Sequence, residues 1–487
     1  MEPLLGLTPT DVLLLAAFLL FVVHHVAYTR KKSSIPGPAF TLPFLGSALS
    51  LVLNPTRYWE EQARMARSSP LGLSANFILG RFMVFIHDVD LSHRVFSNVS
   101  HGVIHLIGHP FGKKLFGEHN LIYLTDQEHK DIRRSIAPNF TPRALSSYIA
   151  AQQAVIRAHL RSWLALGSSS PIPLRTRCRD MNLETSQTVF VGPYLDREAR
   201  DRFDSDYGLF NSGLMALPID LPGFAFRRAH RAVSRLVDTL AACATRCRSN
   251  MSAGHQPRCL MDFWIQDIVS GSDAKLSDRE IGGHVFDFLF AAQDASTSSL
   301  LWAISMLESH PDVLARVRAE QQRVRPDPDA PISADQIADM TYTRMVAKEV
   351  VRFRPPATLV PHIAACDFPI SDGYTVPKGA ILFPSLLEAA FQGFSDPDRF
   401  DPDRFSEERR EDELHKRSWL MFGSGPHQCV GQRYALNHLV LFIALFVTVC
   451  DFKRARSDGC DDIAYKPTIA PKDDCLVYLS PRTKTLL

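Results

Sequence analysis

Residues 419–431, WLMFGSGPHQCVG, present one cysteine among flat and small residues. Glycine lets a backbone turn tightly and approach a neighbouring group closely, so this loop can fold beneath something broad and planar. A long apolar helix is predicted directly after it, over residues 432–450. A thiol near a helix N-terminus feels the positive end of the helix dipole, which favours the thiolate form of Cys429. The stretch therefore indicates a thiolate that can ligate a metal.

The spacing F-x-x-G-x-x-x-C-x-G resembles the haem-ligating loop of the cytochrome P-450 family, and its fixed points are Phe422, Gly425, Cys429 and Gly431. The resemblance implies a cytochrome P-450 fold, mainly α with small β-sheets, and a haem b whose iron has Cys429 as its axial thiolate. It also implies that Phe422, Gly423 and Gly431 contact the cofactor and that His427 pairs with a propionate. The alternative is a buried structural cysteine in a glycine-rich turn, so partner motifs elsewhere must decide.

Composition favours one large catalytic domain over residues 39–487. The chain has 487 residues, of which 46% are hydrophobic, and no Gly/Ser-rich or charged linker follows residue 38. A formal net charge of +2 gives no indication of nucleic acid as a partner. The nine cysteines are scattered without a C-x-x-C pair, which fits neither a disulfide framework nor a zinc site and favours a reducing compartment.

Residues 1–32 are predicted to be an N-terminal membrane anchor. The run 12–28 is apolar apart from two histidines and precedes a basic cluster, the residues concerned being His24, His25, Arg30, Lys31 and Lys32. A helix of roughly 17 residues reaches about 25 Å, which suits the thinner endoplasmic reticulum bilayer. The basic flank predicts a single pass with the catalytic domain in the cytosol. Residues 33–38, rich in proline, are expected to form a stiff hinge, because proline fixes φ and removes a donor.

Two segments are expected to border a substrate pocket. Residues 102–123 are rich in Gly, His and aromatic side chains and are interpreted as a loop, with Phe111 and Phe116 as candidate pocket residues. Residues 200–230 are rich in apolar side chains, and an exposed apolar loop on an anchored protein would dip into the bilayer. In the family, the corresponding region roofs the substrate channel. Core packing is the alternative for this segment.

A short helix is predicted over residues 126–136. His129 and Arg133 are four residues apart and therefore share one face. The resemblance implies that Arg133 binds a haem propionate and that His129, at a position where the family has Trp, donates a second hydrogen bond. A solvated basic helix is the alternative.

A long helix is predicted over residues 283–308, and it is apolar nearly all round, which indicates burial. Its middle nevertheless carries five polar residues, Gln293, Asp294, Ser296, Thr297 and Ser298. Burying such groups is unfavourable unless they are paired, so they indicate either function or a structural hydrogen-bond network.

Within this helix, AAQDAS at residues 291–296 resembles the family signature A-G-x-D-T-T. The resemblance implies that Asp294 and Ser296 relay protons and that Ala291 and Ala295 form part of the pocket wall. Two departures alter the standard relay. Ala292 replaces the usual Gly, and Ala295 stands where a Thr normally follows the acid.

Glu349 and Arg352 form an E-x-x-R pair on one face of a helix that two prolines end. Alone the pair is indistinguishable from a surface salt bridge. Followed by FDPDRF at residues 400–405, it resembles the family's buried Glu-Arg-Arg triad. The resemblance implies that Glu349, Arg352 and Arg404 brace the loop that holds Cys429.

The extended segment 356–362, PATLVPH, resembles the family strand that lines the substrate pocket. The resemblance implies that four residues form the pocket wall, Ala357, Thr358, Leu359 and Val360. It also implies that His362 lies near a propionate. The aliphatic character of the segment indicates an apolar substrate.

The four motifs occur in the family's order, and together they resemble the sterol C-22 desaturase branch, especially its plant form. The resemblance implies NADPH- and O2-dependent introduction of a double bond into a sterol side chain, as in sitosterol to stigmasterol. Electrons would arrive from an NADPH–cytochrome reductase flavoprotein, because the chain has no Gly-rich nucleotide loop of its own. A sterol side-chain hydroxylase would share every motif. A haem-thiolate isomerase and a non-enzymatic haem sensor are further alternatives.

Overall fold

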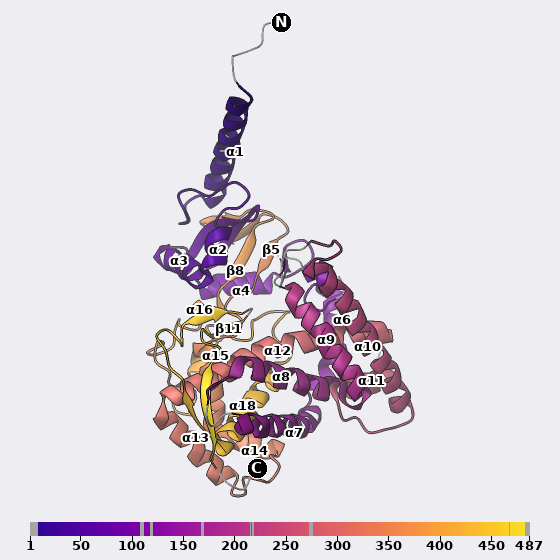
Figure 1. Ribbon diagram of the computed structural model, residues 1–487. Helices are drawn as coiled ribbons and strands as arrows, with labels where there is room; N and C mark the ends of the chain where they lie inside the picture. Colours follow the sequence, from indigo (N-terminus) through magenta and orange to yellow (C-terminus); the bar gives the residue numbers. More distant parts are fainter. Residues whose placement is uncertain are drawn as a thin grey trace.

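Helix α12 (Asp278–Ser309) runs through the middle of the helical part of the molecule (Figure 1). The computed structural model describes residues 8–107, 112–116, 120–166, 170–214, 216, 219–271, 276–466 and 468–482. Phe111, a candidate pocket residue, lies outside these residues. Apolar side chains on almost every face of α12 let it pack on α8 (Leu174–Ser186), α10 (Ala225–Ser252), α15 (Thr341–Phe353) and α18 (Gln432–Val449). The remaining elements are arranged around this centre.

The other described helices are α1 (Pro9–Lys32), α2 (Ala48–Leu53), α3 (Pro55–Ser68), α4 (Val89–Ser97), α5 (Gly112–Phe116), α6 (Asp126–Ile136), α7 (Pro142–Leu166), α9 (Arg197–Leu214), α11 (Leu260–Val269), α13 (Pro311–Val324), α14 (Ala334–Asp339), α16 (Leu386–Ala389) and α17 (Glu411–Leu414). The helix predicted over 126–136 is confirmed as α6, and those predicted over 283–308 and 432–450 are confirmed as α12 and α18 with small changes of boundary. Residues 102–123 are not wholly a loop, since they include β3 (Ile104–Leu106) and α5.

The strands form small sheets at two sides of the helical body. A five-stranded sheet has the order β1-β2-β8-β5-β3, with β1 (Leu73–Ile78), β2 (Arg81–Ile86), β5 (His362–Ala364) and β8 (Ile381–Pro384). A three-stranded sheet has the order β4-β12-β9, with β4 (Ile172–Pro173), β9 (Cys450–Arg454) and β12 (Leu476–Pro481). Two hairpins complete the set, β6 (Phe368–Ser371) with β7 (Tyr374–Val376) and β10 (Ile463–Tyr465) with β11 (Ile469–Pro471). This mainly α architecture with small sheets is the predicted fold class.

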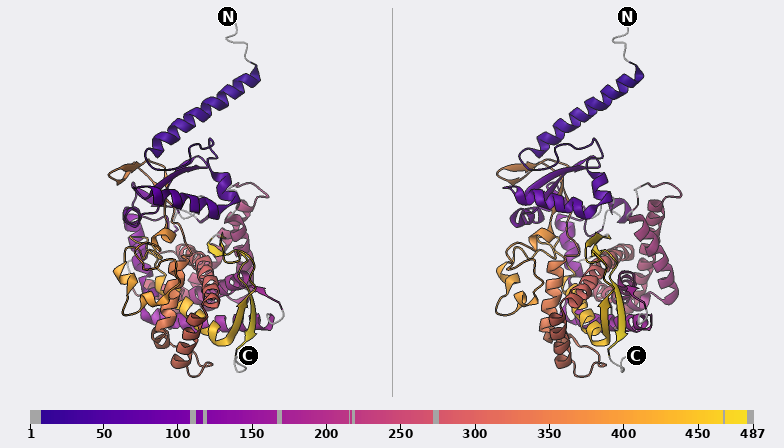
Figure 2. Two further views of the ribbon diagram at one scale, coloured as in Figure 1. Left: turned by 90° about the vertical axis from the view of Figure 1, so that its left-hand side faces the viewer. Right: turned by 60° about the vertical axis from the view of Figure 1, so that its left-hand side comes forward.

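Helix α1 projects from the side of the molecule that carries α2 and the five-stranded sheet (Figure 2). It is long and apolar enough to cross a membrane, with a mean hydropathy of 2.1 in its most apolar window. A capping box at Thr8 and Asp11 begins the helix, and three basic residues end it. Helix α18 passes the same test of length and composition, but it is largely buried in the core of the catalytic domain. Helix α1 is therefore the candidate membrane anchor.

Residues 200–214 belong to helix α9, so the exposed apolar loop predicted over residues 200–230 is wrong for this part of the segment. Phe203, Tyr207, Phe210 and Leu214 are all buried, and they pack in a core shared with α10 and α12. Their spacing of three or four residues places them on the inner face of α9 rather than in an exposed loop. Leu221 and Phe224 are the large apolar residues of this segment that the structure shows exposed. Core packing, the alternative reading, thus accounts for α9.

Glu349, Arg352 and Arg404 form the predicted buried triad. Arg352 Nε donates to Glu349 Oε2 at 2.7 Å and Arg404 Nε to the same oxygen at 3.0 Å, with all three side chains fully buried. The other guanidinium nitrogens donate to backbone carbonyls of Ala390, Ser395, Asp396, Pro397 and Arg399. Arg352 Nη2 also donates to Glu349 Oε1 at 2.8 Å, and Arg404 Nη1 to Glu411 Oε2 at 3.1 Å. The triad thus orders the segment 390–399, upstream of the loop that contains Cys429.

Breaking one arm of this triad is expected to destabilise the domain strongly. In Arg404→Met, Glu349 keeps its charge in the core with one partner fewer, which costs about 3–5 kcal/mol. The matched control is Arg57→Met, because Arg57 pairs with Glu61 on the surface, where an ion pair contributes about 0–1 kcal/mol. Thermal unfolding of both variants in detergent checks the difference. Equal melting temperatures for the two variants would contradict the structural role of the triad.

Candidate functional site

The loop before α18 presents the Cys429 sulfur to the interior. The backbone N–H of Cys429 donates to the carbonyl of Phe422 at 2.8 Å, closing a tight turn. Gly425 has φ +72°, and a Cβ at this position would lie 2.5 Å from the carbonyl oxygen of Phe96. Both the left-handed backbone and the close approach require glycine here. The small residues of the motif are thus explained by the course of the backbone.

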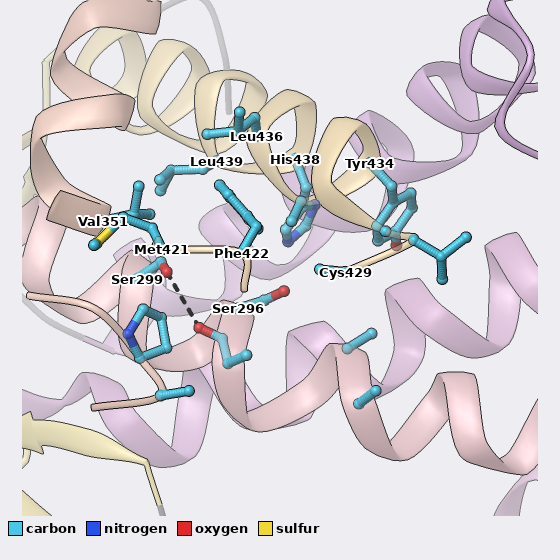
Figure 3. A pocket seen from close by; sticks show the side chains of 18 of the residues that line it. Ser296, Ser299, Val351, Met421, Phe422, Cys429, Tyr434, Leu436, His438 and Leu439 are labelled. Atoms are coloured by element: carbon cyan, nitrogen blue, oxygen red, sulfur yellow. Dashed lines mark hydrogen bonds between the residues drawn. The ribbon is translucent and has the colours of Figure 1, made fainter. Parts of the chain in front are cut away.

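A cavity of about 340 Å³ lies between α12 and α18, with the Cys429 loop on one wall (Figure 3). Its walls are almost entirely apolar. Ten of the predicted site residues line it: Ala291, Ala295, Ser296, Ala357, Val360, Phe422, Gly423, His427, Cys429 and Gly431. All nine cysteines lie within the described residues, and Cys429 is the one that lines this cavity. The sequence motifs around residues 291, 357 and 429 therefore converge on one space.

Burial raises the pKa of the Cys429 thiol, while the backbone N–H of Gly431 and the charge of Arg133 lower it. The Gly431 N–H, at the start of α18, acts in the sense expected from the helix dipole, because it favours the thiolate. A coordinating metal deprotonates a thiol outright. A metal bound at Cys429 would therefore hold this residue as the thiolate.

Four basic side chains meet at the edge of the cavity: His129, Arg133, His362 and His427. The rings of His129 and His427 stack with centroids 4.0 Å apart. The pKa of His427 is lowered to about 3 by burial and by the proximity of His129, His362 and Arg133. Burial likewise lowers the pKa of Arg133 and brings that of His362 to about 4. This cluster therefore offers the charge of Arg133 together with hydrogen-bonding imidazole rings whose lowered pKa favours their neutral form.

Within the described residues, no carboxylate pairs with Arg133 and no hydrogen bond is recorded for the ring of His427. A half-buried guanidinium without an anion is unfavourable, so the cluster fits a ligand that brings negative charge. Haem meets this requirement with two propionates, and the apolar walls and the thiol suit its ring and iron. The residues present therefore fit haem.

Asp294 and Ser296 lie on opposite sides of α12. Residues two apart on a helix point about 200° away from each other. Ser296 projects into the cavity on the side facing Cys429 (Figure 3), whereas Asp294 lies 3.1 Å from Arg179 Nε of α8. The structure does not bring the two predicted relay residues together.

Arg179, the partner of Asp294, lines a second cavity of about 340 Å³ between α8, α9 and α12, which is bordered mostly by charged and polar side chains. Burial raises the pKa of Asp294, and Arg179 and Arg175 oppose this rise. Buried polar atoms of Gln187, Tyr207 and Gln293 border the same cavity without a protein partner. A polar space of this size accommodates several waters that would satisfy such groups.

The other polar residues of α12 belong to a structural network. Thr297 accepts from Asn182 Nδ2 at 2.9 Å, and His438 Nε2 lies 2.9 Å from Asn182 Oδ1, which links α8, α12 and α18. Ser298 Oγ donates to the carbonyl of Ile469 at 2.5 Å. Thr297 and Ser298 thus belong to a structural hydrogen-bond network, which was the alternative to a functional role.

Three candidate pocket residues, Thr358, Leu359 and Phe116, do not line the Cys429 cavity. Thr358 and Leu359 line a third cavity, of about 510 Å³, between α3, α16 and β10. The extended segment is fixed in this orientation because the Thr358 carbonyl accepts from the N–H of Leu386. Phe116 packs in an aromatic cluster with Phe290, at a centroid distance of 4.9 Å, and does not line the Cys429 cavity.

Sequence reasoning missed several residues of the cavity wall, among them Ser299, Val351, Met421, Tyr434 and His438 (Figure 3). His438 had a visible signal, since it is a polar residue within the apolar run 432–450. Val351 lies two residues after Glu349 on α15, and nothing in the sequence marked it as a cavity residue.

Comparison with known proteins identifies the family. The family model described as Cytochrome P450 matches residues 36–472. The chain belongs to the cytochrome P450 family. Members are haem-thiolate oxidoreductases, so the family supplies a haem iron with a cysteine thiolate ligand, in agreement with the fit of the cavity.

Two curated relatives cover nearly the full chain. Cytochrome P450 710A2 of Arabidopsis thaliana is 57% identical over 479 residues, which are 96% of each chain. The C-22 sterol desaturase ERG5 of Saccharomyces cerevisiae is 31% identical over 486 residues, 95% of this chain and 88% of the yeast protein. Among solved structures, cyanobacterial CYP120A1 with bound retinoic acid has a TM-score of 0.78 at 23% identity and covers 92% of this chain and 100% of its own, which confirms the P450 fold.

Removing the charge of Arg133 is expected to weaken haem retention. Arg133→Gln loses a charge-assisted hydrogen bond of about 1.5–3 kcal/mol, so haem loss to excess apomyoglobin should accelerate by roughly 10- to 100-fold. Arg134→Gln is the matched control, because Arg134 is the next residue of α6 and its side chain is 78% exposed. Equal rates of haem loss from the two variants would contradict the role assigned to Arg133.

Proposed function

We propose that this protein is an NADPH- and O2-dependent sterol C-22 desaturase, which introduces a double bond into a sterol side chain, as in sitosterol to stigmasterol. The observation that carries the proposal is the full-length similarity to proteins named C-22 sterol desaturases, from Saccharomyces cerevisiae and Gibberella zeae, each 31% identical to this chain. The apolar cavity beside Cys429 supports a lipid substrate.

The residues of the site are assigned as follows. Cys429 would ligate the haem iron, and Arg133, His129, His427 and His362 would hold the propionates. When bound, the thiolate-ligated haem supplies the chemistry that activates O2 for attack on an unactivated C–H bond. Ala291, Ala295, Ala357 and Val360 shape the apolar wall against which the sterol side chain lies.

The balanced reaction removes one hydrogen from each of two adjacent carbons. NADPH and the substrate each supply two electrons, O2 is reduced to two molecules of water, and a C=C bond forms. The position of the second carbon decides whether its hydrogen is removed or the first carbon is hydroxylated. That choice depends on the positioning of the side chain by the cavity wall.

Proton supply is assigned to two separate groups on α12. Ser296 Oγ holds and passes a proton inside the apolar cavity. Asp294 lies on the outer side of α12, paired with Arg179, which lines the polar cavity and connects Asp294 with it. Because Ala295 lacks the hydroxyl of the usual Thr, Ser296 is the hydroxyl of this chain's AAQDAS stretch that reaches the apolar cavity.

The electron donor is an NADPH–cytochrome reductase flavoprotein. Basic residues near the thiolate face would steer an acidic partner, namely Arg133, Arg134, Lys416, Arg417 and Arg433. The anchor helix α1 with its basic end supports a single pass through the endoplasmic reticulum membrane and a cytosolic catalytic domain.

Turnover of sitosterol tests the function directly. Membranes containing this protein, a reductase and NADPH are given sitosterol, and the products are separated by gas chromatography with mass spectrometry. We expect a product lighter by two hydrogen atoms, with a double bond in the side chain. A product heavier by one oxygen atom would identify a sterol side-chain hydroxylase and overturn the desaturase assignment.

Ser296→Ala is expected to lower product formation by roughly 10²-fold, the lower range for loss of a group that transfers protons. NADPH consumption should fall less, so that less product forms per NADPH oxidised. Ser299→Ala is the matched control, since Ser299 lines the same cavity but donates its hydroxyl to the Ala295 carbonyl at 3.2 Å. If Ser296→Ala leaves turnover and coupling unchanged, Ser296 is no proton relay.

A further inference from the structure

The hairpin of β10 and β11 is hydrogen-bonded to the polar middle of α12. Thr468 Oγ1, at the start of the return strand, donates to the backbone carbonyl of Asp294 at 3.1 Å. Ser298 Oγ of α12 donates to the carbonyl of Ile469 at 2.5 Å. The described residues of the hairpin all lie outside the walls of the Cys429 cavity. The hairpin therefore touches α12 behind the residues that line this cavity.

Arg454 fixes both ends of the hairpin. Asp461 lies two residues before β10, and Asp473 lies two residues after β11. The buried guanidinium donates from Nη1 to Asp461 Oδ1 at 2.7 Å and from Nη2 to Asp473 Oδ1 at 2.8 Å. Ser305 Oγ, further along α12, also donates to Asp461 Oδ1, at 2.7 Å. Moving either carboxylate away would leave a buried charge without its partner, so the base of the hairpin is held rigidly on α12.

The hairpin also contacts the segment 356–360. Burial raises the pKa of Tyr465 in β10, and a side-chain hydrogen bond with Thr358 lowers it. Tyr465 and Thr358 line the third cavity, whereas Ala357 and Val360 of the same segment line the Cys429 cavity. One hairpin thus joins the outer sides of two walls of the Cys429 cavity, α12 and the segment 356–360.

Thr468 acts on the turn of α12 that contains Ser296. In an α-helix the carbonyl of Asp294 accepts from the N–H of Ser298, four residues further on. Thr468 adds a second donor to this carbonyl, whose two lone pairs accept both. Ser296 lies in the middle of the same turn, with its side chain in the cavity. The position of Ser296 is therefore coupled to the hydroxyl of Thr468.

We propose that the hairpin of β10 and β11 sets the position of Ser296 relative to the segment 356–360, and that Thr468 is the positioning residue of this link. The inference rests on the proposed function, in which Ser296 passes a proton and the segment forms the wall for the sterol side chain. Because the base of the hairpin is rigid, a shift of one wall is transmitted to the other through the Thr468 hydroxyl. Thr468 acts only through Ser296, since it lies outside the cavity.

Thr468→Val removes this hydroxyl and keeps a branched side chain. With any sterol that the protein converts, we expect the product formed per NADPH oxidised to fall by roughly two- to tenfold, the range for one lost neutral hydrogen bond. Haem content and the KM for the sterol should stay at wild-type values, because Thr468 does not line the cavity. Thr468→Ser keeps the hydroxyl and should restore the wild-type ratio of product to NADPH.

Thr239→Val is the matched control for this experiment, because Thr239 Oγ1 donates to a carbonyl of its own helix, that of Arg235 in α10, at 2.9 Å. Its ratio of product to NADPH should equal that of the wild type. An unchanged ratio in Thr468→Val would overturn the positioning role. An equal loss in Thr468→Ser and Thr468→Val would assign the effect to packing of the methyl group and would overturn it as well.

Amide hydrogen exchange tests the link without a sterol, so its outcome is independent of the proposed function. In the haem-loaded protein, Thr468→Val should accelerate exchange of β10 and β11 by roughly two- to tenfold, again the range for one hydrogen bond. Thr468→Ser and Thr239→Val should exchange at the wild-type rate. Wild-type exchange in Thr468→Val would show that the hydroxyl does not hold the hairpin on α12, and the proposal would be wrong.

Discussion

Presenting the Cys429 sulfur to the space between α12 and α18 is the constraint on which the other features of the site depend. The tight turn from Phe422 to Cys429 requires backbone conformations that only glycine adopts easily, and α18 must begin directly after the turn. Burial raises the pKa of this thiol, and a coordinating metal would hold it as the thiolate. The upstream segment 390–399 is ordered by a triad of buried charges, which makes the approach to the loop rigid.

The basic side chains at the edge of the cavity also fit a bound haem. The basic groups Arg133, His129, His362 and His427 converge without a protein carboxylate among the described residues, and their mutual repulsion, with burial, depresses the pKa of His427. A cofactor with two propionates would pair with the charge of Arg133 and favour the protonated form of the neighbouring histidines. Haem binding and the stability of this edge of the domain are therefore coupled, because an anion bound only by the folded state stabilises it.

Much of this was predictable from the sequence, for identifiable reasons. Cys429 and the pair Glu349 and Arg352 stand in short patterns whose geometry is local, and the order of these patterns along the chain, which resembles that of the family, assigned them to one site. The separation of Asp294 from Ser296 follows from helical periodicity and needed only the 100° step per residue. By contrast, Thr358 and Leu359 face another cavity because a contact with Leu386, distant in the sequence, fixes the segment. The hydrogen bond from Thr468 to the carbonyl of Asp294 is likewise a tertiary contact, and the sequence around Thr468 gave no sign of it.

The most direct test of the account is the carbon monoxide difference spectrum of the reduced protein, compared between wild type and Cys429→Ser. The account predicts the spectrum characteristic of thiolate ligation in the wild type and its loss in Cys429→Ser, while Cys366→Ser, which changes a cysteine outside the cavity, retains it. A thiolate spectrum that survives in Cys429→Ser would show that another residue ligates the iron and would contradict the assignment of the site.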